Sequence, residues 1–279
     1  MPKLAVLGQP IAHSRSPAMQ TAALEALGLA GEWGYEAIEV SPQDFEARVR
    51  AMPGEGFAGA NVTVPHKLAA LGVADTASPA ARAIGAANTL SFGDRGIEAD
   101  NTDAAGLLAA LPISPAGKRA VVLGAGGSAR ACVWALVETG AAVSIWNRTR
   151  SRAGALASEL GATVAEPGGR PLGAGTYDVL INATTVGLEA ANSPKRRGPD
   201  PLADLKALPL DADSVEARHV VVDLVYGRSE TPLEAFVRER GASVVDGLEV
   251  LVHQGAASLR LWTGGEPPLD VMRKAARRI

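Results

Sequence analysis

The sequence is poor in cysteine, in net charge and in long apolar runs. Cys132 is the one cysteine among 279 residues, so no disulfide can form within the chain, and a reducing compartment is expected. A formal net charge of −3 gives no reason to expect nucleic acid or an anionic membrane as a partner. Only four apolar residues follow Lys3, too few for a signal peptide, and no run approaches the ~20 residues that span a bilayer. We therefore expect a cytoplasmic protein that binds neither nucleic acid nor a membrane.

The composition and patterning are those of a folded α/β protein. Hydrophobic residues make up 47% and charged residues 20%, and the length suits two domains. Short apolar or β-branched runs alternate with Ala- and Leu-rich stretches, which favours mainly parallel sheets. Residues 112–117 are rich in turn formers and indicate a boundary, whereas 188–218 lack periodicity and are expected to be mostly loop. The pattern predicts strands at 3–8, 59–64, 87–92, 96–100, 119–123, 142–146, 177–182, 219–224 and 242–245, and helices starting at Ser16-Pro17 and Pro65 and spanning 43–52, 103–111, 129–138, 248–262 and 267–279.

A glycine-rich turn between the predicted strand at 119–123 and the helix at 129–138 is the clearest local signal. The turn, Gly124-Ala125-Gly126-Gly127-Ser128-Ala129, has G-x-G-x-x-A spacing. Gly124 allows the tight turn, Gly126 lets the backbone approach a pyrophosphate, and Ala129 lets the helix pack closely on the strand. Glycine also serves ordinary turns, but between a strand and a helix this spacing predicts a dinucleotide site.

The end of the next predicted strand indicates which dinucleotide binds. An NAD-specific domain usually carries Asp or Glu there for the ribose hydroxyl, whereas this strand is followed by Asn147-Arg148-Thr149-Arg150-Ser151-Arg152. No carboxylate repels a 2′-phosphate, and the guanidinium groups can pair with one. The alternative is a solvated, arginine-rich helix start, which the helix dipole disfavours. We therefore expect NADP rather than NAD.

Short polar motifs crowd the N-terminal third of the chain. Hydroxyls and amides both donate and accept hydrogen bonds, which suits recognition of a polyhydroxylated small molecule. Interconversion of a carbonyl and an alcohol also needs a group that transfers the alcohol proton, and Lys67 and Asp103 are the best candidates. The motifs are Ser14-Arg15-Ser16, Asn61-Val62-Thr63-Val64-Pro65-His66-Lys67, Ala87-Asn88-Thr89 and Asp100-Asn101-Thr102-Asp103.

Several of these residues also have ordinary interpretations. Lys67 could be a solvated helix residue, Asp103 a carboxylate stabilised by a helix dipole, and Ser16 a helix N-cap. His66 is next to Lys67, but consecutive residues on a helix point in different directions, which argues against it as the base. The histidines and the cysteine show no metal-ligand spacing, so no metal site is expected.

Taken together, these motifs and Asp246-Gly247-Leu248 resemble the shikimate dehydrogenase family, over nearly the whole chain and in the family's order. The resemblance implies reduction of 3-dehydroshikimate to shikimate with NADPH, a step of aromatic amino acid (chorismate) biosynthesis. It implies an α/β fold of two domains. Residues 1–102 and 247–279 would form the substrate domain, and 103–246 an inserted Rossmann domain that binds NADP. It leaves a homodimer open.

The resemblance also implies roles for individual residues. Lys67 and Asp103 would be the catalytic pair. The substrate would be held by Ser14, Ser16, Asn61, Thr63, Asn88, Tyr226 and Gln254. NADP contacts would come from Gly124, Ala125, Gly126, Gly127, Ser128, Ala129, Asn147, Arg148, Thr149, Arg152, Thr184, Leu224 and Gly247.

Two rival functions remain. A quinate/shikimate dehydrogenase with broader substrate and cofactor choice is the nearer one, although the Asn147 to Arg152 stretch argues against its NAD-using forms. A nucleotide-sensing protein that keeps the NADP fold without chemistry is the other. Intact Lys67 and Asp103 argue against it, because a sensor needs no proton donor.

Overall fold

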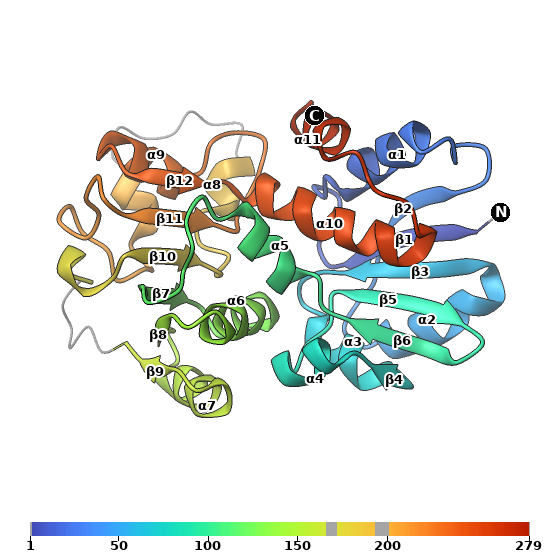
Figure 1. The fold of residues 1–279 in the computed structure, drawn as a ribbon, viewed down its shortest axis with the longest axis horizontal. Coiled ribbons are helices and arrows are strands. Elements are labelled where there is room, and N and C mark those ends of the chain that lie inside the picture. Colours follow the sequence, from blue (N-terminus) through green and yellow to red (C-terminus); the bar gives the residue numbers. More distant parts are fainter. Residues whose placement is uncertain (1, 166–171, 193–200, 279) are drawn as a thin grey trace. The chain divides into compact units, whose positions relative to one another are not determined.

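The computed structural model describes residues 2–165, 172–192 and 201–278 and divides the chain into two compact units (Figure 1). The first consists of Met1–Ala109 and Leu251–Ile279, and the second of Ala110–Val250. Both borders lie a few residues beyond those predicted from the sequence, so Asp103 belongs to the first unit. The functional division of labour between the units stays a prediction at this point.

The first unit is built on a six-stranded mixed sheet. Its order is β2-β1-β3-β5-β6-β4, in which β1 pairs in parallel with β2 and β3. β5 is antiparallel to both of its neighbours, which departs from the expected parallel arrangement. The reason is a tight hairpin between Gly93 and Gly96, where Gly96 has a φ of +85°. The strands are β1 (Lys3–Gly8), β2 (Gly34–Glu39), β3 (Phe57–Val62), β4 (Thr76–Ala77), β5 (Thr89–Gly93) and β6 (Gly96–Asp100).

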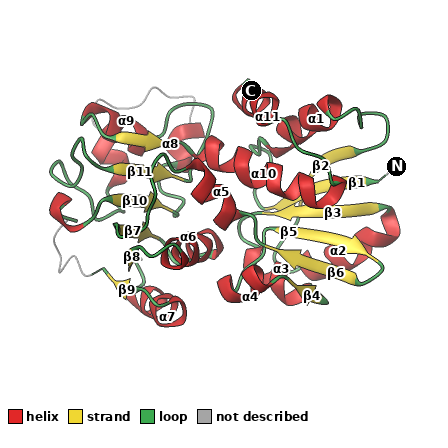
Figure 2. Cartoon of the chain, viewed as in Figure 1, coloured by secondary structure: helices red, strands yellow, loops and turns green. Residues whose placement is uncertain are grey.

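Helices cover this sheet (Figure 2), and its apolar side chains are buried. Phe45, Val49 and Met52 pack with Leu7 and Leu90 in one fully buried cluster. Each such side chain contributes roughly 1.5–3 kcal/mol to folding. The helical elements are α1 (Ser16–Ala26), α2 (Phe45–Ala51), the 3-10 turn η1 (Met52–Glu55), α3 (Lys67–Val73), α4 (Pro79–Ile84), α5 (Asp103–Ala110), α10 (Gly247–Thr263), which lies in this unit from Leu251 on, and α11 (Leu269–Arg277).

Two local interpretations of this unit need correction. Ser16 is the first residue of α1 rather than its N-cap; Arg15 is the N-cap, and no side chain caps this helix. Instead the Ser16 N–H donates to Oγ of Ser14 at 3.3 Å. The helix α4 was not predicted, although Ser78 caps it by accepting from the Ala81 N–H at 3.1 Å and a proline follows.

One face of α10 lies against β3 and β5. Trp262 donates from Nε1 to the Leu90 carbonyl at 3.1 Å, and the indole fills the space that a Cβ on Gly59 would need. One turn earlier Ser258 contacts Asn61, and one turn before that Gln254 contacts Asn88. The spacing of four residues keeps these three α10 side chains on one stripe of the helix. This stripe brings the C-terminal segment to the polar residues of the N-terminal sheet.

The second unit contains a six-stranded parallel sheet of order β12-β11-β10-β7-β8-β9. The chain runs outward from β7 to β9 and then returns to β10, so the order reverses between β7 and β10. In doubly wound sheets the ligand lies outside the carboxyl ends of the strands at this reversal. The strands are β7 (Arg119–Leu123), β8 (Ala142–Trp146), β9 (Thr163–Val164), β10 (Val179–Asn182), β11 (Val220–Asp223) and β12 (Ser243–Val245).

Connecting helices bury the faces of the second sheet. Leu180 and Val221 pack against Phe236 and Val237 of α9 in a buried cluster. The 188–218 segment, predicted to be mostly loop, contains two short helical elements in its described residues, while 193–200 lie outside the description. The helical elements are α6 (Gly127–Glu138), α7 (Arg150–Leu160), η2 (Ala174–Thr176), α8 (Leu188–Asn192), η3 (Pro201–Leu205) and α9 (Pro232–Glu239).

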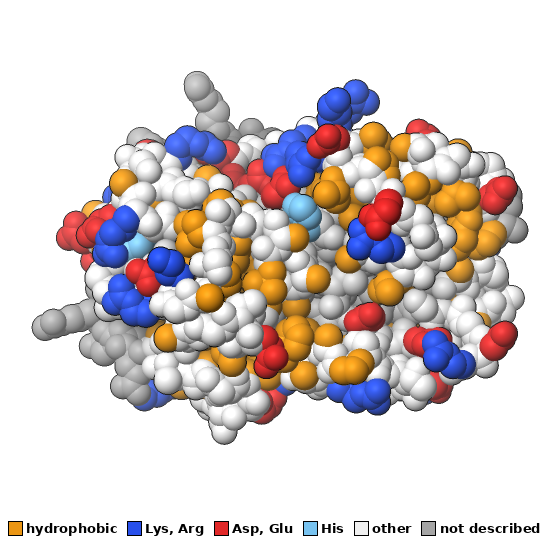
Figure 3. Space-filling model, in the orientation of Figure 1, with side chains coloured by type: hydrophobic (Ala, Val, Ile, Leu, Met, Phe, Trp, Pro, Cys, Tyr) orange, Lys and Arg blue, Asp and Glu red, His pale blue; other side chains and the backbone are white. Residues whose placement is uncertain are grey.

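The surface carries both signs of charge. On the face drawn in Figure 3, acidic and basic side chains lie beside one another among apolar and neutral atoms. Over the surface as a whole, such ion pairs include Arg119 with Asp178 and Arg95 with Glu98. Among the described helices, none has the length and apolar character needed to cross a membrane.

Candidate functional site

Polar side chains gather at one edge of the first sheet. The carboxyl ends of β1, β3 and β6 and the amino end of β5 meet there, because β5 runs opposite to its neighbours. The segments carrying Ser14, Thr63, Asn88 and Asp103 all leave the sheet at this edge. The local strand order thus places four separate sequence motifs at one end of one sheet.

Lys67 and Asp103 form the charged centre of this edge. The ammonium Nζ of Lys67 lies 2.7 Å from Oδ2 of Asp103, and their side chains are only 10% and 15% exposed. Each residue is the first of its helix, α3 and α5 respectively. The α3 dipole disfavours a cation at its start, and the Asp103 carboxylate beside the ammonium offsets that effect. A proton donor is thereby held nearly out of water.

His66 faces away from this pair. Its ring stacks on Phe45 with centroids 4.4 Å apart, and Nε2 lies 2.8 Å from the Val40 carbonyl oxygen. The ring is 2% exposed, so the imidazole fastens the start of α3 to the core. This packing fixes the backbone from which Lys67 projects.

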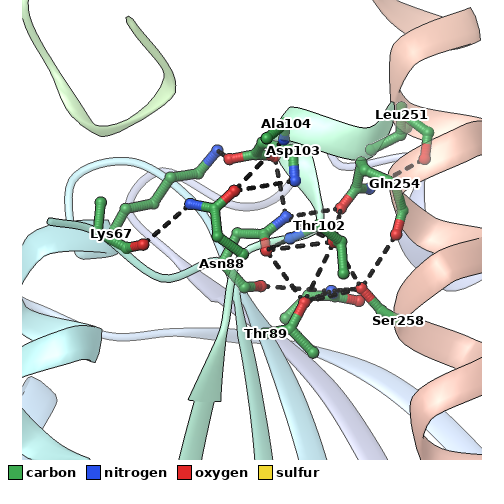
Figure 4. Close-up of polar contacts among 12 residues, drawn as sticks. Lys67, Asn88, Thr89, Thr102, Asp103, Ala104, Leu251, Gln254 and Ser258 are labelled. Carbon is green, nitrogen blue, oxygen red and sulfur yellow. Dashed lines mark hydrogen bonds and ion pairs between the residues drawn. The ribbon is translucent and has the colours of Figure 1, made fainter. Parts of the chain in front are cut away.

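Asn88 connects the catalytic candidates to α10 (Figure 4). Its Nδ2 donates to Oδ1 of Asp103 at 2.9 Å and to Oε1 of Gln254 at 3.0 Å. Asp103 therefore accepts from Lys67 on one oxygen and from Asn88 on the other, and the two contacts fix the orientation of its carboxylate. Nε2 of Gln254 donates to the Leu251 carbonyl at 2.9 Å, so both ends of this amide are oriented.

Three buried hydroxyls lie beneath these amides. Thr89 and Thr102 stand in the polar motifs singled out from the sequence, without a role of their own, whereas Ser258 was not predicted. Ser258 Oγ lies 2.8 Å from Thr89 Oγ1 and 3.0 Å from Thr102 Oγ1, and it donates to the Gln254 carbonyl at 3.1 Å. Thr89 donates to Oδ1 of Asn88 at 3.1 Å. The i, i+4 spacing of Gln254 and Ser258 was the signal available, because it puts a second polar residue on the same face of an apolar helix.

Asn61 joins the same network from β3. Its Nδ2 donates to Ser258 at 2.9 Å, and its Oδ1 accepts from the Tyr35 hydroxyl at 2.8 Å. Asn61 is only 5% exposed, so its amide is almost completely buried. Nδ2 also lies 3.4 Å from the Asn88 carbonyl oxygen and 3.5 Å from Oγ1 of Thr89, so its donors are directed toward protein acceptors.

Ser14, Ser16 and Thr63 lie at the same sheet edge, outside the hydrogen bonds that join Asn61, Asn88 and Gln254. Thr63 follows β3, and its methyl group lies where a Cβ on Gly8 would be, at the end of β1. Ser14 is half-buried in the loop that follows β1. The carboxyl ends of β1 and β3 are therefore in contact, and the segment that follows each strand carries a hydroxyl residue.

Close packing fixes α5 against α10. A Cβ on Gly106 would lie 2.7 Å from Cβ and 2.8 Å from the backbone nitrogen of Gln254. A glycine at this position therefore lets the helix that begins with Asp103 touch the backbone of the helix that carries Gln254. The two polar side chains are positioned by helix contact as well as by hydrogen bonds.

The glycine-rich turn lies at the carboxyl edge of the second sheet and fits a dinucleotide. Gly124 has a φ of +117°, and a Cβ there would lie 2.8 Å from the Ala183 carbonyl oxygen. A Cβ on Gly126 would meet no atom within 4 Å, so the space outside the turn is open. Gly126 is also the N-cap of α6 and brings no side-chain cap, and the start of a helix favours an anion.

The residues expected to bind the rest of the nucleotide lie at the same edge. Asn147 follows β8 and donates to the Thr149 carbonyl at 2.9 Å, while Arg148 and Arg152 are exposed around the start of α7. Thr184 follows β10 and Leu224 follows β11; Tyr226, which is expected to contact the substrate, lies two residues after Leu224. A Cβ on Gly247 would lie 2.7 Å from the Leu224 carbonyl oxygen, so these two segments touch.

Within the described ranges, no group of three or more His, Cys, Asp or Glu side chains is arranged to hold a metal ion. Cys132 is a buried thiol on α6.

Three family models match successive parts of the chain. The shikimate dehydrogenase substrate binding domain matches residues 6–90, the shikimate / quinate 5-dehydrogenase model matches 109–187, and the shikimate 5'-dehydrogenase C-terminal domain matches 247–277.

Known proteins resemble the chain over its whole length. An NADP-dependent shikimate dehydrogenase of Anaeromyxobacter sp. is 43% identical over 282 residues, covering 97% of this chain and 94% of that protein. The crystal structure of shikimate 5-dehydrogenase from Thermus thermophilus with NADP(H) and shikimate has a TM-score of 0.85 at 41% identity, covering 100% of this chain and 99% of that one. The ligand-free 5-ketofructose reductase of Gluconobacter sp. has a TM-score of 0.81 at 30% identity, covering 99% and 97%.

Proposed function

The chain belongs to the shikimate dehydrogenase family, and we propose how its residues perform the reaction. It is an NADP-dependent oxidoreductase that interconverts 3-dehydroshikimate and shikimate in aromatic amino acid biosynthesis. In the proposed division of labour, the first unit binds the substrate and the second binds NADP. The observation that carries the proposal is the ion pair of Lys67 and Asp103 inside a network of amides and hydroxyls.

Lys67 is the proposed proton donor. Bound NADPH supplies the hydride that reduces the ring carbonyl. The Lys67 ammonium donates a proton to the carbonyl oxygen, which becomes the hydroxyl of shikimate, and the resulting amine regains a proton from solvent. Asp103 orients Lys67 through the 2.7 Å contact and offers its remaining lone pairs to a ring hydroxyl. In the reverse direction the neutral amine accepts the hydroxyl proton.

Amides and hydroxyls are proposed to hold the rest of the substrate. Ser14, Ser16 and Thr63 supply hydroxyls near the ends of β1 and β3 for the substrate carboxylate and hydroxyls. Asn61, Asn88 and Gln254 supply amides whose orientation is already set by protein contacts. Such preorientation lowers the entropy lost when the substrate binds. Tyr226 is proposed to lie by the substrate, on the segment that follows β11.

The choice of NADP over NAD is proposed to depend on the start of α7. Arg148 and Arg152 would pair with the 2′-phosphate, and Asn147 and Thr149 would contact the adjacent ribose. The Gly124 to Ala129 turn would hold the pyrophosphate at the start of α6. Thr184, Leu224 and Gly247 would contact the nicotinamide end.

A broader quinate/shikimate dehydrogenase is the second candidate. The family model over residues 109–187 covers both shikimate and quinate enzymes, and a structural neighbour at 30% identity is named for another carbonyl substrate. The sensor alternative is disfavoured because the chain keeps a buried lysine–carboxylate pair.

Turnover tests these proposals directly. NADPH formation is followed by absorbance with shikimate or quinate as substrate and NADP or NAD as acceptor. We expect activity confined to shikimate with NADP. Comparable rates with quinate or NAD would identify the broader enzyme, and tight NADP binding without turnover would favour a sensor. A cytoplasmic location and a homodimer complete the proposal; cell fractionation tests the first and sedimentation velocity the second.

A further inference from the structure

The second unit contains a buried carboxylate that the proposed reaction does not use. Asp223 ends β11 and is 0% exposed. Burial raises the pKa of this carboxyl to about 6, and hydrogen bonds from Thr231, Val225 and Asn182 oppose the rise. A charged group held in such a place needs a full set of donors, because an unpaired buried charge is strongly destabilising.

All three partners present donors to Asp223, and their directions are fixed. Val225 donates its backbone N–H to Oδ1 at 3.1 Å. Asn182 donates Nδ2 to Oδ1 at 2.9 Å, since its own Oδ1 already accepts the Thr184 backbone N–H at 3.1 Å. Thr231 donates its hydroxyl to Oδ2 at 2.6 Å, since its oxygen accepts the Glu234 N–H at 3.1 Å. The surroundings of Asp223 therefore present donors to both oxygens of a carboxylate.

These partners come from three different chain segments. Asn182 ends β10, Val225 lies in the segment after β11, and Thr231 is the N-cap of α9. The capping box of α9 is complete, because Glu234 also accepts the Thr231 N–H at 3.0 Å. One carboxylate thus joins the ends of two neighbouring strands to the start of the helix that follows them.

The contacts continue into the turn after β10. Oδ1 of Asn182 accepts the Thr184 hydroxyl at 2.7 Å, and Oγ1 of Thr184 accepts the Val186 N–H at 3.1 Å. Nδ2 of Asn182 also lies 3.2 Å from the Val186 carbonyl oxygen. The same amide that meets Asp223 therefore sets the shape of residues 184–186.

We propose that Asp223 is a positioning residue for cofactor binding, which holds the 184–186 turn and the 224–225 segment in the arrangement that receives NADP. The inference rests on the proposed function, in which Thr184 and Leu224 contact the nicotinamide end. Asp223 itself is completely buried and acts through Asn182 and the Val225 N–H. Its removal should therefore weaken NADP binding and leave shikimate binding intact.

Asp223→Asn is the first test, because it keeps the shape and replaces one acceptor by a donor. Two donors meet at Oδ1, so the new NH2 group would face Thr231, whose hydroxyl hydrogen loses its acceptor. We expect the Kd for NADP, measured by calorimetry, to rise about tenfold, the loss typical of one charge-assisted hydrogen bond. The KM for shikimate at saturating NADP should change less than about twofold, below the effect of one such bond.

Thr231→Val is the second test and leaves Asp223 in place. It removes the donor to Oδ2 and the side-chain cap that accepts the Glu234 N–H, while the two donors to Oδ1 stay in place. A smaller rise in the Kd for NADP is therefore expected, and the variant decides the matter if Asp223→Asn does not fold.

Tyr177→Phe is the matched control. It removes another buried hydrogen bond of this unit, from the Tyr177 hydroxyl to the Ser214 carbonyl, just before β10 begins and thus at the opposite edge of the sheet. It should lower the Tm while leaving the Kd for NADP unchanged. If Asp223→Asn and Thr231→Val also lower the Tm but bind NADP like the wild type, the carboxylate is only structural and the proposal is wrong. Failure of the wild-type protein itself to bind NADP would instead refute the proposed function.

Discussion

The backbone N–H of Thr102 donates to Oδ1 of Asn88 at 2.7 Å, and this contact determines which way the Asn88 amide faces. A backbone N–H can only donate, so Oδ1 must point to Thr102 and Nδ2 to Asp103 and Gln254. The reversed amide would place an oxygen against two further oxygens. The turn after β6 therefore determines which groups of the Asn88 amide donate and accept in the proposed substrate site.

Replacing Lys67 by Ala should lower turnover far more than substrate affinity. A positioned proton donor contributes roughly 100- to 10,000-fold to rate, so kcat should fall by at least about 100-fold while the KM for shikimate changes only a few-fold. Steady-state kinetics with saturating NADP measures both. Lys3→Ala is the control, because Lys3 is an exposed lysine of the same unit that lies over the Phe57 ring. A loss confined to KM would refute the proton-transfer role.

Replacing Ser258 by Ala should impair shikimate binding without touching NADP. The change removes the acceptor 2.9 Å from Nδ2 of Asn61 and leaves a buried donor unsatisfied. We expect a stability loss of about 1–3 kcal/mol and a several-fold rise in the KM for shikimate. Urea unfolding and kinetics report the two effects. Thr263→Ala is the matched control, since its hydroxyl also bonds to the preceding turn of α10, at the Leu259 carbonyl, but does not contact Asn61. Equal effects of both variants on KM would count against a role for Ser258 in the site.

The double change Arg148→Ala and Arg152→Ala should reduce discrimination between the two nicotinamide cofactors. Each arginine can offer charge-assisted hydrogen bonds to a 2′-phosphate that NAD lacks, so kcat/KM with NADP should fall about 10- to 100-fold while the value with NAD stays unchanged. Arg218→Ala, an exposed arginine of the same unit paired with Glu216, controls for loss of charge. A parallel fall with both cofactors would mean that these arginines do not read the phosphate.

Acid should stabilise the region around Asp223 instead of weakening it. Because burial raises its pKa from 3.8 to about 6, the folded protein holds this proton more tightly than the unfolded chain does. The resulting stability is present below about pH 4 and is lost as the pH rises through about 6, up to about 3 kcal/mol. The difference in unfolding free energy between wild type and Asp223→Asn, measured by urea titration across this range, should therefore shrink with rising pH.

Asp178 provides a control of opposite sign for that experiment. Hydrogen bonds from Arg119 lower the pKa of Asp178, so its contribution is lost as the pH falls. The difference between wild type and Asp178→Asn should accordingly grow with rising pH. A wild-type advantage over Asp223→Asn that also grew with pH would contradict the expected titration of Asp223.

Local patterns predicted much of the fold. The strands β1, β6, β7 and β8 have the predicted bounds, because each is a compact run closed by glycine or by polar residues. β2 was not predicted, since it is an edge strand whose residues are exposed or only half-buried and no apolar run marks it. The antiparallel pairing of β5 was not predicted, although the glycines at 93 and 96 are typical of the tight hairpin that produces it.

Residues of the candidate site could be predicted where a short sequence motif contains them. They could not be predicted where the site forms only by contact between distant segments. Lys67 and Asp103 came from motifs, and the structure brings them to 2.7 Å, although their catalytic role stays a prediction. Ser258 was missed because its hydrogen-bond partner Asn61 lies 197 positions earlier in the chain. Tyr35 was missed for the same reason, since its hydroxyl finds Asn61 only once β2 and β3 flank β1.

The composition of the first unit from two separate stretches bears on how the protein is made. As the nascent chain leaves the ribosome, residues 110–250 emerge as a continuous and complete folding unit, whereas Asn61, Asn88 and Thr89 have already been synthesised without the α10 side chains that they bind. The hydrogen bonds of these amides and hydroxyls to Gln254 and Ser258 can form only after α10 has been synthesised. Assembly of the proposed substrate site therefore requires one of the last segments to be synthesised, and a chain that stops before α10 would hold the second unit without the α10 side chains of that site.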